Sequence, residues 1–232
     1  RAGQEGAVGE YEADDSFPID DIDDILPGLL EGTDSIFNAM GVNAEFDQRL
    51  IGWVNHIKGQ SRSGLHVPSE FVSLDYVLHD MRLYKSPEEL KLMRRAAAIS
   101  TTAHQIAMKT CAPGHYEFQI AAEFDYEFRK NNAQHAYSAI VGGGANSCIL
   151  HYTENSDELR DGDLLLIDAG CEVEGYASDI TRTFPVNGKY SNAQREIYEI
   201  VLAAQKAAIK KVKPGNHWND PHNAAVKVIT KG

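Results

Sequence analysis

Residues 163–184 read Asp-Leu-Leu-Leu-Ile-Asp-Ala-Gly-Cys-Glu-Val-Glu-Gly-Tyr-Ala-Ser-Asp-Ile-Thr-Arg-Thr-Phe, and this stretch decides the fold of the chain around it. The apolar run 164–167 is typical of a short buried strand, and it ends abruptly on an ionisable residue, Asp168. After a glycine-flanked turn comes the β-prone segment 176–184, which carries Asp179 on its face of smaller side chains. Two strands with a short connection form a hairpin, so Asp168 and Asp179 are expected to meet across it.

The two aspartates allow two interpretations. Spacing alone favours a structural one, in which Asp168 stabilises the turn through an Asx hydrogen bond and Asp179 lies on a solvated face. The alternative is a metal site, because two carboxylates that face each other repel unless a cation lies between them. Hard oxygen ligands suit Mg, Ca or Mn, and hydrolases such as aminopeptidases repeatedly use paired divalent ions.

Four segments of the chain follow, in the same order, the pattern of one known family. They are Ile-Leu-His-Tyr-Thr-Glu-Asn (149–155), Asp-Gly-Asp-Leu-Leu-Leu-Ile-Asp-Ala-Gly-Cys-Glu (161–172), Gly-Tyr-Ala-Ser-Asp-Ile-Thr-Arg-Thr-Phe-Pro-Val-Asn-Gly-Lys (175–189) and Gln-Arg-Glu-Ile-Tyr-Glu-Ile-Val-Leu (194–202). Together they resemble bacterial Xaa-Pro aminopeptidase (aminopeptidase P), one of the pita-bread metallopeptidases, as are prolidase and creatinase. The resemblance implies that Asp168 and Asp179 are metal ligands. It also implies that His151 is a catalytic residue that binds the substrate, and that Tyr137 lines the pocket for the N-terminal residue.

The resemblance implies an α+β fold in two parts. Residues 79–232 are expected to form the first half of a pita-bread catalytic domain, and residues 1–78 part of an α/β N-terminal domain. The family site has five metal ligands, and the other three, a histidine and two glutamates, belong to a later half of the domain that has no counterpart in this chain. By itself the 232-residue chain is therefore expected to be inactive.

The function implied by the resemblance is release of the N-terminal residue from peptides with proline in second position. In the family, two divalent ions of the Mn²⁺ type activate a hydroxide for this hydrolysis. A prolidase-type Xaa-Pro dipeptidase and a non-catalytic pita-bread binding protein are the alternatives. Family members commonly assemble, so a homo-oligomer is expected.

Composition bears on partners and compartment. The net charge is −12, with eleven acids and one base in residues 1–34, and no basic stripe exists to bind nucleic acid. No apolar run approaches the roughly 18 residues that span a bilayer, so no membrane contact is expected. Three cysteines at no metal-like spacing favour buried thiols in a reducing compartment, and the cytoplasm is expected.

Apolar periodicity and capping signals place the remaining elements. Helices are expected over 44–57, 86–112, 117–130, 191–212 and 222–231, and strands over 35–39, 71–74, 136–141 and 147–151. Leu90, Met93, Ala97 and Thr101 are expected to lie on one face of the second helix, and Ile197, Val201, Ala204 and Ala208 to form the buried stripe of the fourth. His104 is expected to be a surface or internally satisfied histidine, because no second ligand follows at helical spacing.

Overall fold

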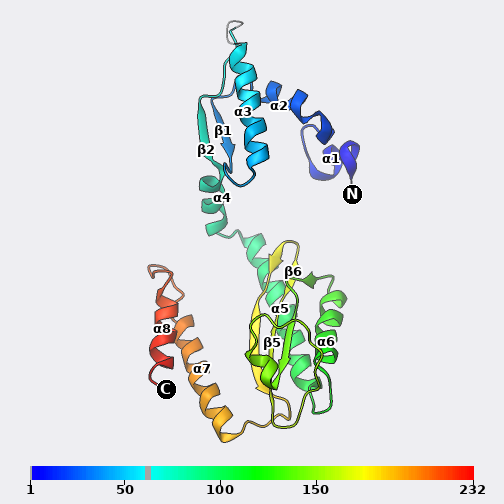
Figure 1. The fold of residues 1–232 in the computed structure, drawn as a ribbon, viewed down its shortest axis with the longest axis vertical. Helices are drawn as coiled ribbons and strands as arrows, with labels where there is room; N and C mark the ends of the chain where they lie inside the picture. The colour runs from blue at the N-terminus through cyan, green and yellow to red at the C-terminus, as the bar shows by residue number, and fades with distance from the viewer. Residues whose placement is uncertain (1, 61–63) are drawn as a thin grey trace. The chain divides into compact units, whose positions relative to one another are not determined.

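The computed structural model describes residues 2–60 and 64–232 (Figure 1). The chain divides into two compact units, residues 1–85 and 86–232. The division falls after residue 85 and not after residue 78, because helix α4 (Leu74–Leu83) continues across the expected boundary. Both units contain helices and strands, which confirms the predicted α+β class.

The first unit is built on a parallel pair of strands, β1 (Ser35–Asn38) and β2 (Glu70–Ser73), as expected from their β-prone sequences. Its helices are α1 (Gly3–Tyr11), α2 (Ile22–Leu30), α3 (Ala44–Gly59) and α4, with a short 3-10 turn at Ile19–Asp21. The Asn43 side chain caps α3 by accepting a hydrogen bond from the Phe46 amide. Apolar side chains of α3 at helical spacing form this unit's core: Leu50, Trp53 and Val54 are buried and pack with Ile36 of β1, and Phe46 is half-buried against them.

The second unit contains two three-stranded antiparallel sheets, in the orders β3-β6-β7 and β4-β5-β8. The strands are β3 (Gln134–His135), β4 (Ile140–Gly143), β5 (Leu164–Ala169), β6 (Cys171–Val173), β7 (Tyr176–Ala177) and β8 (Ile180–Pro185). The helices are α5 (Pro87–Thr110), α6 (Glu117–Lys130), α7 (Asn192–Ile209) and α8 (Asp220–Ile229). The predicted capping boxes begin α5 at Ser86 and α7 at Ser191, and α8 packs on α7 (Figure 1).

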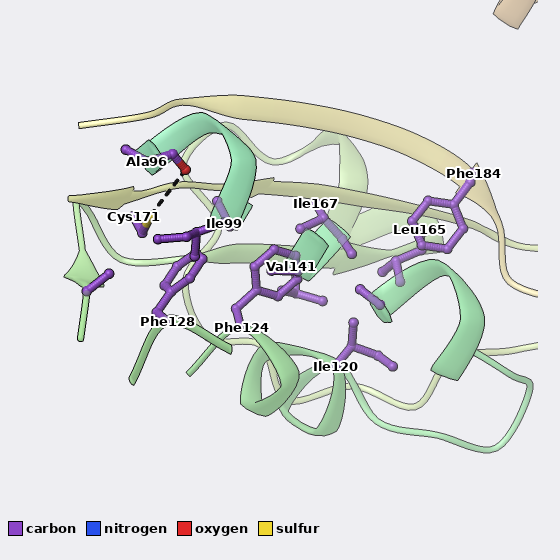
Figure 2. Close-up of a cluster of buried hydrophobic side chains, with 14 of the residues drawn as sticks. Ala96, Ile99, Ile120, Phe124, Phe128, Val141, Leu165, Ile167, Cys171 and Phe184 are labelled. Carbon is purple, nitrogen blue, oxygen red and sulfur yellow. Dashed lines mark hydrogen bonds between the residues drawn. The ribbon is translucent and has the colours of Figure 1, made fainter. Parts of the chain in front are cut away.

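The core of the second unit lies between α5, α6 and the sheets. Figure 2 shows Ala96 and Ile99 of α5, Phe124 and Phe128 of α6, and residues of β4, β5 and β8 gathered in one cluster. The Cys171 thiol donates to the Ala96 carbonyl, at 3.4 Å, and so joins β6 to α5. This packing holds the sheets against two helices, and it includes β5, which carries Asp168, and β8, which begins one residue after Asp179.

The predicted hairpin is present, and its register places the two aspartates. Its tight turn is Glu174–Gly175, where both residues have positive φ as in a type I′ turn. Further along, β5 pairs with β8 so that Asp168 lies opposite Thr181. Asp179 precedes Thr181 by two residues, and it is therefore the diagonal neighbour of Asp168 on the same face.

The buried face of α5 consists of Ala96, Ile99, Ser100, Ala103, His104 and Ala107, whereas Met93, Ala97 and Thr101 are exposed and Leu90 is half-buried. The expectations for α7 and for residues 147–151 are wrong. In α7 only Ala204 of the predicted stripe is buried, and Ile197 is 63% exposed. The segment 147–151 is not a strand, because a 3-10 helix (Gly144–Cys148) and a turn occupy it.

The three cysteines differ in their surroundings. All of them are free thiols, but only Cys171 is buried, while Cys111 is half-buried and Cys148 is exposed. Burial raises the pKa of the Cys111 thiol to about 11, so this thiol stays protonated at neutral pH. The expectation of buried thiols is therefore wrong for Cys148.

None of the helices in residues 2–60 and 64–232 has the length and apolarity to cross a bilayer.

Candidate active site

Asp168 and Asp179 converge on one hydroxyl group. The Tyr137 hydroxyl lies 2.6 Å from Asp168 Oδ1 and 3.0 Å from Asp179 Oδ1. A phenol has a single proton, so it donates to one carboxylate at a time, and the two carboxylates share this donor. Burial is the main cause that raises the pKa of Tyr137 above its ordinary value, followed by the hydrogen bonds and charges of the two aspartates. Tyr137 is therefore a neutral hydrogen-bond donor at physiological pH.

A cavity of about 370 Å³ opens beside this group. It is lined by Tyr137, Ser138, Ile140, His151, Thr153, Asp168 and Asp179. The structure thus brings every predicted site residue, with Tyr137, to one cavity. His151 is exposed, and within the described part of the chain its imidazole has no hydrogen-bond partner, so both ring nitrogens can reach a ligand. Its backbone φ is +57°, in the left-handed region that residues other than glycine seldom adopt.

Gly170 allows the hairpin strands to approach each other next to the carboxylates. A Cβ atom at this position would lie 1.8 Å from the backbone oxygen of Ser178. The Ser178 hydroxyl donates to the Cys171 carbonyl and accepts from the Ser100 hydroxyl of α5, at 3.0 and 2.8 Å. The Cys171 amide donates to the Ser100 hydroxyl, at 3.0 Å. This fully hydrogen-bonded buried group fixes the backbone that leads directly into Asp179.

His104, one turn after Ser100 on α5, supports the opposite strand. Its Nε2–H donates to the Ala169 carbonyl, at 3.2 Å, and its ring stacks edge-on against Phe124 at 5.0 Å. Burial lowers the pKa of His104, and this effect outweighs the opposing hydrogen bond to Ala169. The expectation of a satisfied histidine holds for Nε2 only, because the buried Nδ1 has no partner among the described residues.

We expect His104 to make the second unit sensitive to acid. Its pKa is lower in the folded state than its ordinary value of 6.5, so the unfolded chain takes up a proton first as the pH falls below 6.5. The contribution of His104 to the free energy of unfolding is therefore fully present above pH 6.5 and is lost as the pH falls below it. Asp168, which raises the pKa of His104, and Arg182, which lowers it, are the charged groups that act on the imidazole.

The measurement is the thermal unfolding midpoint of the chain at about pH 7.5 and about pH 5.5. His104→Gln keeps an amide donor for Ala169 without a titrating group, and we expect it to lose less stability on acidification than the unchanged chain. His222→Gln on the exposed side of α8 is the matched control. Equal acid sensitivity in all three proteins would show that His104 titrates as it does in the unfolded chain.

The two carboxylates fit a divalent cation as part of a ligand set. Both are hard oxygen donors that share one neutral donor, and neither takes part in an ion pair within the described part of the chain. A divalent ion of this kind takes about six oxygen ligands or more. Across residues 2–60 and 64–232 no group of three or more His, Cys, Asp or Glu side chains is arranged to hold a metal.

Comparison with known proteins agrees with this geometry. Residues 91–232 match metallopeptidase family M24. Xaa-Pro aminopeptidase of Escherichia coli (strain K12) is 42% identical over 233 residues, which cover 100% of this chain and 53% of that protein. The solved structure of Pseudomonas aeruginosa aminopeptidase PepP is 57% identical with a TM-score of 0.92, and the match covers 100% of this chain and 52% of that one. Zn-substituted E. coli aminopeptidase P in complex with product is 42% identical with a TM-score of 0.90, at 100% and 53% coverage.

The chain spans about half the length of the curated relatives it matches. The high TM-scores with these solved relatives confirm the predicted partial pita-bread fold. The family match covers more than half of the chain and includes both aspartates, His151 and Tyr137. On these grounds the chain belongs to metallopeptidase family M24.

Proposed function

We propose that this chain forms part of a metallo-aminopeptidase that releases the N-terminal residue from peptides with proline in second position. The observation that carries the proposal is the convergence of Asp168 and Asp179 on a cavity that His151 also lines. The relatives support the specificity, because proteins that are 42% and 40% identical to this chain are Xaa-Pro aminopeptidases.

Asp168 and Asp179 would hold two divalent ions, of the Mn²⁺ type, together with ligands that lie outside this chain. When bound, such ions supply a water that is activated at neutral pH and a Lewis acid for the peptide carbonyl. The chain's own contribution is geometric. The hairpin register and the buried hydrogen bonds at Ser178 keep the two carboxylates on one face, so they need little rearrangement to bind cations.

His151 would act on the substrate, and Tyr137 would act on the two carboxylates. The His151 imidazole is exposed at the rim and is free to donate a hydrogen bond to a peptide carbonyl, which stabilises negative charge that develops on that oxygen. Tyr137 stays protonated, so its hydroxyl keeps donating to the carboxylates instead of adding a third negative charge to the site. A cytoplasmic location and assembly into a homo-oligomer stay predictions.

We propose that the 232-residue chain alone binds Mn²⁺ weakly and does not cleave peptides, because two carboxylates are a small part of the shell that such an ion needs. In contrast, the full-length protein should release the N-terminal residue from an Xaa-Pro-Xaa tripeptide when Mn²⁺ is present, and a chelator should abolish this release. The readout is mass spectrometry of the released residue, with calorimetry of Mn²⁺ binding to both proteins.

Two peptide controls separate the alternatives. A tripeptide with alanine in second position should not be cleaved, and an Xaa-Pro dipeptide should be a poorer substrate than the tripeptide. Cleavage of the dipeptide alone would instead favour a prolidase-type dipeptidase. The absence of cleavage of any of these peptides by the full-length protein with Mn²⁺ would favour a non-catalytic protein, and submicromolar Mn²⁺ affinity of the 232-residue chain would contradict the proposed weak binding.

A further inference from the structure

Glu117 is a fully buried carboxylate that the proposed chemistry does not use. It is the first residue of α6 and has 0% exposed surface, whereas charged side chains are almost never fully buried without partners. Four donors surround it, and no basic side chain is among them. A position at the N-terminus of a helix also favours negative charge. The four hydrogen bonds fix the groups that donate them around this carboxylate.

The two oxygens of Glu117 bind opposite ends of one loop. Oε1 accepts from the Gly143 amide at 2.7 Å and from the Asn146 side-chain amide at 3.1 Å. Oε2 accepts from the Tyr152 hydroxyl at 2.7 Å and from the Asp157 amide at 3.0 Å. The segment between Asn146 and Tyr152 is thus closed at both ends by a single carboxylate.

The closed segment carries His151. Cys148, Ile149, Leu150 and His151 are all exposed, so little packing holds the segment between its two ends. His151 nevertheless has a left-handed backbone, which the surrounding structure must impose. Tyr152, the next residue, is only 6% exposed, and its hydroxyl donates a hydrogen bond to Glu117. The anchor of the strained histidine is therefore its immediate neighbour.

We propose that Glu117 is a positioning residue, which fixes the conformation of the loop 143–157 and so presents His151 to the cavity. A side-chain amide in place of the carboxylate would turn one acceptor atom into a donor that faces two other donors. At least one of the four hydrogen bonds would be lost, because a backbone N–H cannot accept, and the site is too buried for water to replace it. The part of this inference that concerns turnover depends on the proposed aminopeptidase function.

The test compares Glu117→Gln with Glu127→Gln in the full-length protein. Glu127 is a matched control because it is a buried acid on the same helix, 4% exposed, whose partners are Asn131 and Lys130 and not the loop. Hydrogen exchange by mass spectrometry is the first readout. Glu117→Gln should speed exchange of the amides in 143–157 about tenfold or more, and Glu127→Gln should leave this segment unchanged.

Kinetics with the tripeptide provide the second readout. Glu117→Gln should lower kcat/KM about 100-fold, the loss expected when a contacting group is displaced by about 1 Å. The same substitution in a His151→Ala background should have little further effect, because the group that it positions is already absent. If the variant does not fold, Tyr152→Phe removes one of the four hydrogen bonds and should show the same pattern with smaller amplitude.

Two results would overturn the inference. One is unchanged exchange in 143–157 for both Glu117→Gln and Tyr152→Phe, and the other is full additivity of Glu117→Gln with His151→Ala. A full-length protein that cleaves no Xaa-Pro peptide would contradict the proposed function instead. In that case the exchange experiment still decides whether Glu117 holds the loop.

Discussion

Asp168→Asn is expected to lower Mn²⁺-dependent tripeptide cleavage by the full-length protein about 10³-fold or more, which corresponds to roughly 4 kcal/mol of transition-state stabilisation. Asparagine keeps the size of the side chain and an oxygen that can accept the hydrogen bond from the Tyr137 hydroxyl. It removes the negative charge that a divalent ion requires. The loss should therefore appear both in kcat/KM and in Mn²⁺ affinity, measured by steady-state kinetics and by calorimetry.

The same substitution should not destabilise the fold. Asp168 and Asp179 are like charges that share one donor, so removing one charge relieves repulsion. We expect the unfolding midpoint to stay constant or to rise, while activity is lost. Asp161→Asn, in the loop before β5 and outside the cavity, is the control that should leave both properties unchanged. Activity within tenfold of the unchanged protein would contradict the role of Asp168 as a metal ligand, and a lower midpoint together with lower activity would show that Asp168 has a structural role.

Gly170→Ala is expected to destabilise the second unit by about 3 kcal/mol or more, which lowers its unfolding midpoint by roughly 6–12 °C. The added Cβ would lie 1.8 Å from the Ser178 oxygen and 2.6 Å from its carbonyl carbon. Both are backbone atoms, so a rotamer change cannot relieve the clash. The strands must separate, and this separation also moves Asp179, which follows Ser178. Mn²⁺ affinity should fall together with stability.

Gly52→Ala is the matched control for this substitution. Gly52 lies in the middle of α3, and a Cβ there meets no atom within 4 Å. Because alanine is a better helix former than glycine, this variant should be neutral or more stable, by up to about 1 kcal/mol. A Gly170→Ala protein that unfolds at the same temperature as the unchanged chain would show that the strands at Ser178 tolerate a wider separation.

The parts of the fold that local patterns encode could be predicted from sequence. The hairpin follows from an apolar run, a turn and alternation, and its register brings Asp168 and Asp179 together without help from distant residues. The caps at Asn43, Ser86 and Ser191 are equally local, because the donor and acceptor lie three residues apart. Proximity of His151 to the aspartates was implied by resemblance and not by its spacing.

The missed features depend on partners that are distant in sequence. The buried face of α5 includes Ser100 and His104, which a rule based on apolar periodicity assigns to solvent. Their partners are Cys171 and Ala169, more than 60 residues later, so no window on the helix reveals the match. The helical pattern predicts Glu117 only as the start of a helix, because its donors Gly143, Tyr152 and Asp157 lie 26, 35 and 40 residues later in the sequence.

The exposed stripe of α7 is a different kind of miss. Ile197 and Val201 do lie on one face of the helix, as the pattern predicts, but they are 63% and 55% exposed. A hydrophobic stripe shows that a helix has an apolar face, and it does not show which segment covers that face. In residues 86–232, α7 packs mainly against α8, and nothing described there covers this stripe.

The left-handed backbone of His151 has a consequence for protein engineering. Glycine has no Cβ atom and adopts this conformation without strain, so a glycine at residue 151 would make the folded chain more stable. A library screened only for heat resistance would drift towards glycine at residue 151, whereas a library screened for turnover would keep the histidine if His151 binds the substrate as proposed. Stabilisation campaigns on this protein should therefore exclude residue 151 from randomisation, together with the loop that holds it.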